Sequence, residues 1–312
     1  MRNIATLTMN PTIDVSFDVD NVHPTHKIRG RNERHDPGGG GINVARMFVR
    51  LGGNARCFYL AGGATGEALD GLLDLHQLVR ARVPIRGETR VSTSIFESLT
   101  GEQYRFVTNG PVIQPNEWQH CLALLAQTDC EYLVASGSLP EGVPQDFYAR
   151  IISAVAGRGI RVVLDSSGAA LEQGLAGGCV YLVKPSIGEL STLVGRELID
   201  ERAIAEAAQG IVQSGQAEHV AVTLGSDGAL LANAAGNLRL PAIPVKAASA
   251  VGAGDSFLAA TLYALATDRD LPDAFRFGLA AGAAAALTQG TDLARPEDIH
   301  RLFAEAAQLA PR

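Results

Sequence analysis

One short stretch of the sequence combines glycines with a carboxylate immediately before an apolar run. Gly252, Ala253, Gly254 and Asp255 precede residues 257–265, which are apolar enough for a buried helix. The start of such a helix presents unpaired backbone N–H groups and the positive end of the helix dipole, and glycines let an anion approach them. A carboxylate there suits a base that takes a proton from an attacking hydroxyl. The stretch indicates phosphoryl transfer, although Asp is also a preferred N-cap and Gly-Ala-Gly often forms only a tight turn.

Four more polar runs follow predicted strands. In open α/β sheets, ligands bind at the carboxyl ends of the strands, so these runs are expected at one edge of the sheet. Each run alone is typical of a connecting turn, but all five segments carry groups that suit phosphate or metal. Together they favour a polyphosphate ligand. The four runs are residues 136–140, 165–168, 184–189 and 223–228.

Several other kinds of site are disfavoured. The chain has no G-x-x-x-x-G-K-[ST] loop, no G-x-S-x-G elbow and no H-E-x-x-H pair. His23, His26 and His35 lie near one another in the sequence, but no further ligand completes a zinc set. Arg90 and Arg105 flank a predicted hairpin turn, where they are placed to bind a sugar phosphate or simply to face solvent.

The composition narrows the class of protein. The chain has 312 residues, of which 46% are hydrophobic and 19% charged, so a large core is possible. A net charge of −7 argues against a general nucleic-acid or anionic-membrane binder. Cys57, Cys121, Cys130 and Cys179 form no C-x-x-C pair, which is typical of reduced thiols. The N-terminus does not resemble a signal peptide and no apolar run reaches 18 residues, so we expect a soluble, cytoplasmic protein.

Strands alternating with helices predict an α/β fold with a doubly wound, mostly parallel sheet. We expect one domain, residues 1–312, with a small β lid formed by two insertions at about 12–36 and 88–108. Residues 14–36 show the loose alternation of half-exposed strands. The predicted strands are 4–9, 55–61, 91–98, 103–107, 132–136, 161–165, 179–183, 219–224, 229–233 and 237–240. The predicted helices are one opened by residues 38–41, then 66–75, 116–126, 144–156, 187–193, 201–214, 257–265, 272–286 and 296–308.

Over essentially its whole length the chain resembles the PfkB (ribokinase-like) family of carbohydrate kinases. Two family signatures are present in the expected order, residues 38–46 (GGGGINVAR) and 251–257 (VGAGDSF). Within the family the chain is most similar to the minor bacterial kinases that act on fructose 6-phosphate. Supporting runs are residues 101–107, 136–140, 165–168 and 289–291. The resemblance implies a ribokinase-like fold and a homodimer formed through the lid.

The resemblance also implies roles for matched positions. Asp255 is the expected catalytic base, and the backbone of Gly252, Ala253 and Gly254 the anion hole. The residues expected to hold the sugar phosphate are Asp14, Gly39, Gly40, Asn43, Arg90, Arg105 and Ser138. Those expected to bind ATP are Lys184, Ser186, Thr223, Gly225, Ser226 and Gly228. Glu189 is the expected magnesium ligand, and relatives usually have a potassium site near Ser249, Val251, Ala285 and Gly290.

Three positions depart from the family pattern, and a fourth bears on regulation. Ser186 stands where the family usually has Asn, which affects the expected magnesium shell. Ala250 replaces a common Thr, and Asp292 stands where an Arg is common. Lys27 lies where relatives bind a second, inhibitory nucleotide, although a single lysine in a flap is more often solvated.

The function implied is ATP-dependent phosphorylation of fructose 6-phosphate at its 1-hydroxyl, giving fructose 1,6-bisphosphate. The nearest alternatives are 1-phosphofructokinase and tagatose-6-phosphate kinase, which usually have Gly-Gly-Lys-Gly where this chain has residues 38–41. The missing lysine favours the 6-phosphate substrate. A non-catalytic sugar-phosphate sensor is a different class, and the presence of Asp255 argues against it, because a sensor needs no base.

Overall fold

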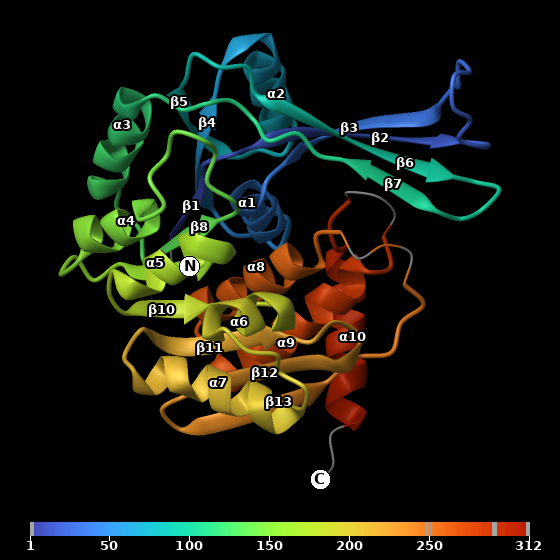
Figure 1. Ribbon diagram of the computed structural model, residues 1–312. Coiled ribbons are helices and arrows are strands. Elements are labelled where there is room, and N and C mark those ends of the chain that lie inside the picture. Colours follow the sequence, from blue (N-terminus) through green and yellow to red (C-terminus); the bar gives the residue numbers. More distant parts are fainter. Residues whose placement is uncertain (1–2, 248, 250, 289–291, 310–312) are drawn as a thin grey trace.

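The computed structural model of the chain describes residues 3–247, 249, 251–288 and 292–309 (Figure 1). Its centre is a nine-stranded sheet in the order β13-β12-β11-β10-β9-β8-β1-β4-β5. Neighbouring strands are parallel except at the β11–β12 and β12–β13 pairs. The strands are β1 (Ile4–Thr8), β4 (Ala55–Ala61), β5 (Val79–Pro84), β8 (Tyr132–Ser136), β9 (Arg161–Asp165), β10 (Val180–Val183), β11 (Ala217–Thr223), β12 (Gly228–Asn233) and β13 (Gly236–Pro241).

Helices cover both faces of this sheet. One face carries α1 (Gly40–Arg50), α2 (Gly63–Leu75), α8 (Ala253–Ala266), α9 (Leu271–Ala285) and α10 (Pro296–Leu309). The other carries α3 (Pro115–Ala126), α4 (Phe147–Val155), α5 (Gly168–Ala176), α6 (Ile187–Val194) and α7 (Glu201–Gln213). A 3₁₀ turn, η1 (Gly225–Asp227), joins β11 to β12.

Alternate residues of each central strand enter two separate hydrophobic cores. In β4, Cys57, Tyr59 and Ala61 pack with the α1–α8 side, whereas Phe58 and Leu60 pack with the α3–α4 side. This alternation follows from the two-residue period of a strand. Strands that are apolar on both faces need helices on both faces, which confirms the doubly wound α/β fold expected from the sequence.

A second sheet of four strands projects from the body (Figure 1). It has the order β3-β2-β6-β7 and contains β2 (Thr12–Val19), β3 (Arg31–Gly38), β6 (Arg90–Glu97) and β7 (Gln103–Phe106). β2 and β6 pair in parallel, although they come from two distant segments. These segments are the two for which the sequence predicted a flap, and we call this sheet the lid sheet.

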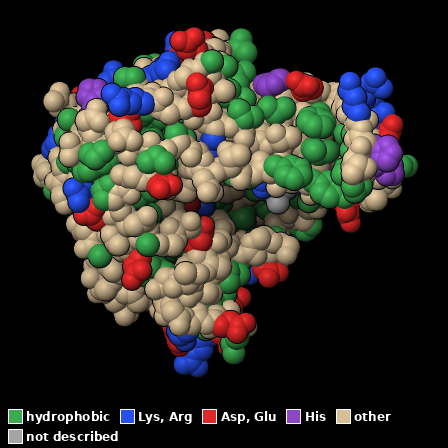
Figure 2. Space-filling view, turned by 45° about the horizontal axis from the view of Figure 1, so that its top comes forward, with side chains coloured by type: hydrophobic (Ala, Val, Ile, Leu, Met, Phe, Trp, Pro, Cys, Tyr) green, Lys and Arg blue, Asp and Glu red, His purple; other side chains and the backbone are tan. Residues whose placement is uncertain are grey.

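The lid sheet exposes large hydrophobic side chains. Phe96 is 44% exposed, Leu99 at the β6–β7 turn 74%, and Phe106 on β7 58%. Figure 2 shows hydrophobic side chains gathered along this projecting arm. Phe106 pairs with Thr93 and Phe96 with Gln103, so the two rings lie on opposite faces of the sheet. Large exposed apolar side chains are common at interaction sites.

Two elements of the main sheet and its helices were not predicted. β5 was missed because Arg80 and Arg82 interrupt its apolar pattern; both pair with Asp70 of α2. α5 was missed because its glycines, Gly168 and Gly174, weaken the helical signal. The predicted helix at 144–156 begins only at Phe147, since residues 144–146 form a turn closed by the Phe147 N–H to Pro144 carbonyl bond of 3.0 Å.

The four cysteines are free thiols, three of them buried, as the sequence predicted. Among the described residues, no helix combines the length and apolarity needed to span a membrane.

Candidate active site

The polar runs that the sequence singled out lie at the carboxyl ends of four adjacent strands, β8, β9, β10 and β11. Parallel strands end at the same edge, so the loops that follow them meet there. The amino-terminal ends of α1 and α8 point to the same edge, since Asn43 of α1 bonds Asp255 of α8. One edge of the sheet therefore brings both signature segments together.

The first turn of α8 presents backbone donors and one carboxylate. Gly252 is the N-cap residue with a φ of 73°, a left-handed conformation that favours glycine. Ala253 and Gly254 follow, and Asp255 is the third helical residue. The first N–H groups of a helix have no intrahelical partner, so this turn can receive an anion beside the carboxylate.

Asp255 is held as a carboxyl group of unusually high proton affinity. Its Oδ2 accepts a 2.9 Å hydrogen bond from Nδ2 of Asn43. Burial, together with the negative charge of Asp165, raises the pKa of Asp255 to about 6, and the Asn43 bond and Lys184 oppose this increase. A group with this pKa is deprotonated at neutral pH yet basic enough to accept a proton during reaction.

Lys184 forms a buried ion pair next to the first turn of α8. Its ammonium lies 3.0 Å from Oδ1 of Asp165, and the residue is only 6% exposed. Burial lowers the pKa of Lys184, but Asp165 and Asp255 outweigh that effect and hold its pKa above the ordinary value. A Cβ placed on Gly254 would be 3.3 Å from Nζ, so the cation is adjacent to the α8 N-terminus. Asp165 thus holds the Lys184 ammonium in place, where it offers a positive charge to a phosphate group.

Asp165 is a residue whose role sequence reasoning missed. Burial raises the pKa of its carboxyl, against the opposing influence of Lys184. Its Oδ2 also accepts a 3.3 Å hydrogen bond from the Ser136 hydroxyl. The sequence placed Asp165 in a polar run after a strand, but nothing in that run indicates that its partner is Lys184, which follows a different strand.

Ser186 and Glu189 form a capping box at the start of α6. The Ser186 N–H and hydroxyl donate to Oε2 of Glu189 at 2.8 and 2.9 Å, and the Glu189 N–H donates back to Ser186 Oγ at 3.3 Å. Ser186, found in place of the usual Asn, therefore fixes the Glu189 carboxylate.

This carboxylate fits a magnesium ion, because Mg²⁺ in kinases is commonly bound by one or two carboxylates, phosphate oxygens and waters. Glu189 also adds to the negative charge beside Asp165. Among the described residues, no three His, Cys, Asp or Glu side chains form a complete metal-binding group. The site thus suits an ion that arrives with a phosphate ligand.

A pocket of about 540 Å³ contains most of the predicted nucleotide residues. Its polar rim includes Ser186 and, from the β11–β12 turn, Thr223, Gly225, Ser226 and Gly228. Gly254 lies at one end, and apolar side chains of α8 and α9 form a wall that suits a flat base: Phe257, Leu279 and Ala283. Lys184 is not part of the lining.

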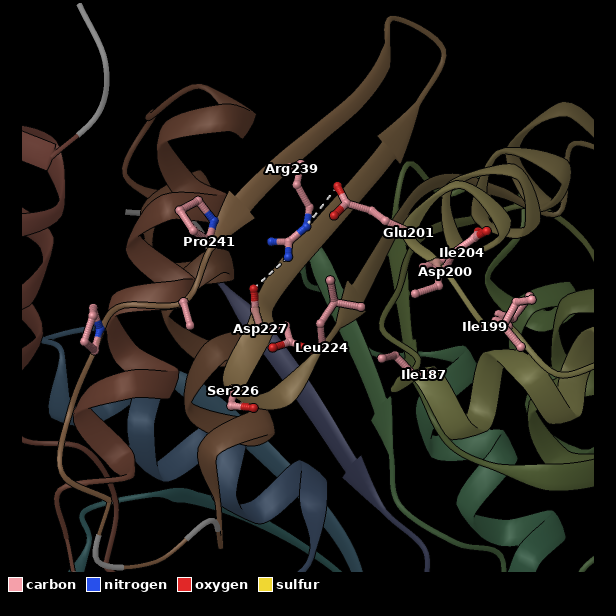
Figure 3. A pocket seen from close by; sticks show the side chains of 13 residues that line it. Ile187, Ile199, Asp200, Glu201, Ile204, Leu224, Ser226, Asp227, Arg239 and Pro241 are labelled. Atoms are coloured by element: carbon pink, nitrogen blue, oxygen red, sulfur yellow. Dashed lines mark hydrogen bonds and ion pairs between the residues drawn. The ribbon is translucent and has the colours of Figure 1, made fainter.

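A second hollow of about 660 Å³ lies against the same β11–β12 turn (Figure 3). Arg239 of β13 lines it. Its Nε lies 3.2 Å from Oε1 of Glu201, and its Nη2 donates a 2.8 Å hydrogen bond to the Asp227 carbonyl. Ser226 lines both cavities. Arg239 thus braces the turn that forms one wall of the nucleotide pocket.

The glycines of the first signature allow close packing on three sides. Gly39 has a φ of 115° and precedes α1. A Cβ on Gly38 would strike the Asp14 carboxylate, one on Gly40 the Ser136 hydroxyl, and one on Gly41 the Leu7 backbone carbonyl. The run therefore brings α1 against β1, β8 and the lid sheet at once.

Asp14 on β2 is a carboxylate that the charges of two predicted sugar-phosphate residues, Arg105 and Arg90, influence. Burial raises the pKa of Asp14 to about 6, and the guanidiniums of Arg105 and Arg90 oppose this rise. Arg105 is exposed on β7, where it is available to an anionic ligand.

Arg90 and Ser138 are less clearly directed at a ligand. The guanidinium of Arg90 donates to the backbone carbonyls of Asn10 and Thr108 at 2.8 and 2.9 Å, so it braces the loop after β7. Ser138 is exposed in the loop after β8, next to Gly137. Lys27 is exposed between β2 and β3, as a solvated side chain would be.

Two of the predicted potassium ligands have hydrogen-bond partners within the chain. Ser249 Oγ accepts from the Val251 N–H at 3.2 Å. The Ala285 carbonyl accepts from both the N–H and the hydroxyl of Thr288, at 3.1 and 2.7 Å, which uses its two lone pairs. The potassium site therefore stays a prediction, and we derive no step through it. Gly290 and Ala250 lie outside the described residues, as does the supporting run 289–291.

Asp292, where relatives often have Arg, is ion-paired with Arg50 of α1 at 3.3 Å. Arg50 also donates to the carbonyls of Leu293 and Ala294, at 2.7 and 3.3 Å. Asp292 is thus held by an arginine at the end of α1.

Residues 6–298 match the family described as pfkB family carbohydrate kinase. The chain is 43% identical over 307 residues to ATP-dependent 6-phosphofructokinase isozyme 2 of Mycobacterium tuberculosis (strain CDC 1551 / Oshkosh), covering 98% of this chain and 90% of that protein. It is 42% identical over 305 residues to the enzyme of the same name from Escherichia coli (strain K12), covering 97% and 99%.

Solved structures of phosphofructokinase-2 from Escherichia coli have the same fold. The complex with potassium superimposes with a TM-score of 0.94 at 41% identity, covering 98% of this chain and 100% of that one. The complex with fructose-6-phosphate and the tetrameric inhibited form each give a TM-score of 0.92 at 40% identity, with the same coverage.

Proposed function

Because the chain belongs to the pfkB family of carbohydrate kinases, we propose that it is an ATP-dependent 6-phosphofructokinase. It transfers the γ-phosphoryl group of ATP to the 1-hydroxyl of fructose 6-phosphate, giving fructose 1,6-bisphosphate and ADP. The observation that carries this proposal is Asp255, a carboxyl group with a pKa of about 6 at the N-terminus of α8, next to the buried Lys184 cation. Relatives with 42–43% identity carry the same activity in their names.

The reaction needs a base, positively charged groups and hydrogen-bond donors that stabilise the charge on the phosphates, and exclusion of water. As the C1 oxygen forms its bond to the γ-phosphorus, the bond from phosphorus to the ADP oxygen breaks and the hydroxyl proton passes to Asp255. The N–H groups of Ala253 and Gly254 and the Lys184 ammonium stabilise charge on the transferring group. Magnesium held by Glu189 would neutralise charge on the ATP phosphates.

The sugar phosphate is assigned to the side of the site below the lid sheet. Arg105 is the proposed ligand of the 6-phosphate, since its guanidinium is exposed there. Asp14 and Asn43 are proposed to bind sugar hydroxyls, and Gly39 and Gly40 leave room for the ring beside α1. Arg90 and Ser138 are proposed as flanking contacts.

We treat residues 1–312 as one domain whose lid sheet covers the sugar. The exposed Phe96 and Phe106 side chains lie on opposite faces of this sheet, so each face has an apolar ring that burial against a second copy would remove from water; this supports a homodimer formed through the sheet. A relative is known in a tetrameric inhibited form, so this chain is proposed to assemble at least to a dimer. ATP and sugar phosphates are metabolites of the cytoplasm, where we expect the enzyme to act.

The test is a coupled assay with ATP over fructose 6-phosphate, fructose 1-phosphate, tagatose 6-phosphate and fructose. We expect the highest kcat/KM with fructose 6-phosphate. The alternatives, 1-phosphofructokinase and tagatose-6-phosphate kinase, usually have a lysine within the glycine run, and residues 38–41 contain none. Faster turnover of fructose 1-phosphate or tagatose 6-phosphate would overturn the assignment. Binding of fructose 6-phosphate without any ADP formation would instead indicate a sugar-phosphate sensor.

A further inference from the structure

The proposed base is linked through one amide to a buried arginine to which no role has been assigned. Arg46 lies on α1, one turn after Asn43, and is 4% exposed. One of its terminal N–H groups, on Nη1, donates to Asn43 Oδ1 at 3.3 Å. Asn43 Nδ2 then donates to Asp255 Oδ2 at 2.9 Å. Three side chains from the two signature segments thus form a continuous chain of hydrogen bonds.

Arg46 is itself held from the opposite side. Nη1 also donates to the Pro37 backbone carbonyl at 2.9 Å, and Nη2 donates to Asp36 Oδ1 at 3.2 Å. Both partners are on β3, in the lid sheet. The planar guanidinium therefore has one orientation that serves β3 and Asn43 together, a geometry that lysine with its single charged nitrogen cannot reproduce.

The contact with Arg46 decides which end of the Asn43 amide faces the base. The two ends of the amide are nearly equal in shape, but only the NH₂ end donates. A guanidinium has donors only, so the amide oxygen must face Arg46 and the NH₂ group must face Asp255. The opposite orientation would set two donors together at Arg46 and two oxygens together at Asp255.

We propose that Arg46 is a positioning residue that locks the Asn43 amide, and thereby holds the Asp255 carboxylate aligned for proton acceptance. This inference rests on the proposed function of the same site. Other charged groups also act on Asp255: Asp165 at the end of β9, Lys184 after β10 and Asp14 on β2. A substitution at Arg46 leaves Asp165 and Lys184 in place. It removes a charge that lowers the pKa of Asp14, and a more neutral Asp14 would lower the pKa of Asp255, which is opposite to the shift expected from the Asn43 contact.

The experiment compares Arg46→Met, Asn43→Ala and the double variant in the full-length enzyme. Without Arg46 the amide is free to rotate, and Asp255 loses a bond that lowers its pKa. We expect Arg46→Met to lower kcat roughly 10- to 100-fold with KM for ATP within about twofold. The acid limb of the kcat/KM profile should move up by about half to one pH unit. The double variant should be no slower than Asn43→Ala alone, since both act through one contact.

Two measures keep the test decisive. If Arg46→Met folds poorly because the contact between Arg46 and Asp36 is lost, Arg46→Met/Asp36→Asn and Arg46→Lys replace it, with the same pH shift expected. Arg82→Met is the matched control: Arg82 also binds a backbone carbonyl, of Ala61 at 3.1 Å, and a carboxylate, of Asp70 at 2.7 Å, away from the site. We expect it to lower Tm without moving the pH profile.

A readout independent of turnover separates this inference from the proposed function. The Asp255 carboxyl is titrated by ¹³C NMR in the wild type and in Arg46→Met, with its signal assigned from Asp255→Asn. An upward shift in Arg46→Met supports the positioning role even if fructose 6-phosphate is not the substrate. An unchanged titration, a wild-type pH profile in an active Arg46→Met enzyme, or multiplicative losses in the double variant would overturn it. An inactive wild type would refute only the proposed function.

Discussion

Replacing Asp255 by Asn should remove activity and at the same time stabilise the fold. Asn keeps an oxygen that can accept the 2.9 Å bond from Asn43, but it cannot accept a proton. We expect kcat to fall roughly 10²- to 10⁴-fold, while KM for ATP and for the sugar phosphate change little.

The stability effect follows from the direction of the pKa change. The pKa of Asp255 is raised from 3.8 to about 6 on folding. Between these pH values the folded protein binds more protons than the unfolded chain, so the free energy of unfolding falls as pH rises through this window and stays lower above it. At about 1.4 kcal/mol per pKa unit, the ionised carboxyl costs roughly 1–3 kcal/mol at pH 8. Removing it should raise Tm by roughly 2–6 °C at pH 8.

The assay is calorimetry of the wild type and Asp255→Asn at pH 8 and pH 4, beside coupled kinetics. At pH 4 the folded wild type is already protonated, so the two melting temperatures should nearly coincide. Asp146→Asn is the control, because Asp146 forms an exposed ion pair with Arg150 at 2.9 Å and should change stability by less than about 0.5 kcal/mol. A lower Tm for Asp255→Asn at pH 8 would refute the argument that the buried, ionised carboxylate destabilises the fold. An unchanged kcat would show that the base is another group.

Three further substitutions test other contacts of the site. Gly41→Ala should lower the free energy of unfolding by roughly 1–3 kcal/mol, because its methyl group would strike the Leu7 carbonyl; denaturant unfolding measures this. Lys184→Met should lower kcat/KM for ATP by about 10²-fold or more and destabilise the fold, since it leaves Asp165 buried without its cation; kinetics and melting measure both. Arg239→Ala should raise KM for ATP about two- to tenfold with little change in kcat, because the β11–β12 turn loses its brace.

Each of these has a result that would contradict it. The control for the glycine substitution is Gly71→Ala in α2, where a Cβ meets no atom within 4 Å and helix propensity should make the change neutral or stabilising. Equal effects at both glycines would rule out the steric argument. Normal KM and kcat in Lys184→Met would contradict the second prediction, and a fall in kcat alone in Arg239→Ala would contradict the third.

Much of the fold could be predicted from the chain alone. The β4 and β8 strands were located to the residue, because short apolar runs bounded by Gly, Asn or Pro have few other interpretations. The lid sheet was anticipated from loose alternation in residues 14–36 and from a predicted hairpin formed by residues 91–98 and 103–107. The parallel pairing of β2 with β6 was not, because nothing local specifies a partner as distant in the sequence as Arg90 is from Thr12.

The residues of the site also divide into those that the sequence identified and those that only the structure revealed. Asp255 was identified from the sequence because glycines and a carboxylate stand directly before an apolar helix. Lys184 and the β11–β12 turn were expected at the sheet edge because they follow predicted strands, and their nucleotide roles were implied by the family resemblance. Asp165 and Arg46 were not assigned roles, since each acts only through a partner on another element, 3.0 Å from Lys184 and 3.3 Å from Asn43.

Local sequence thus determined where the chain turns, which residues are buried and which carboxylate sits at a helix start, because backbone sterics and hydrophobic periodicity act over a few residues. Only the tertiary structure decided that Asp255 has a raised pKa, that Glu189 is oriented by Ser186, and that the Ala285 carbonyl is already occupied. Burial and charge depend on neighbours brought together from distant parts of the chain, and no short pattern encodes them.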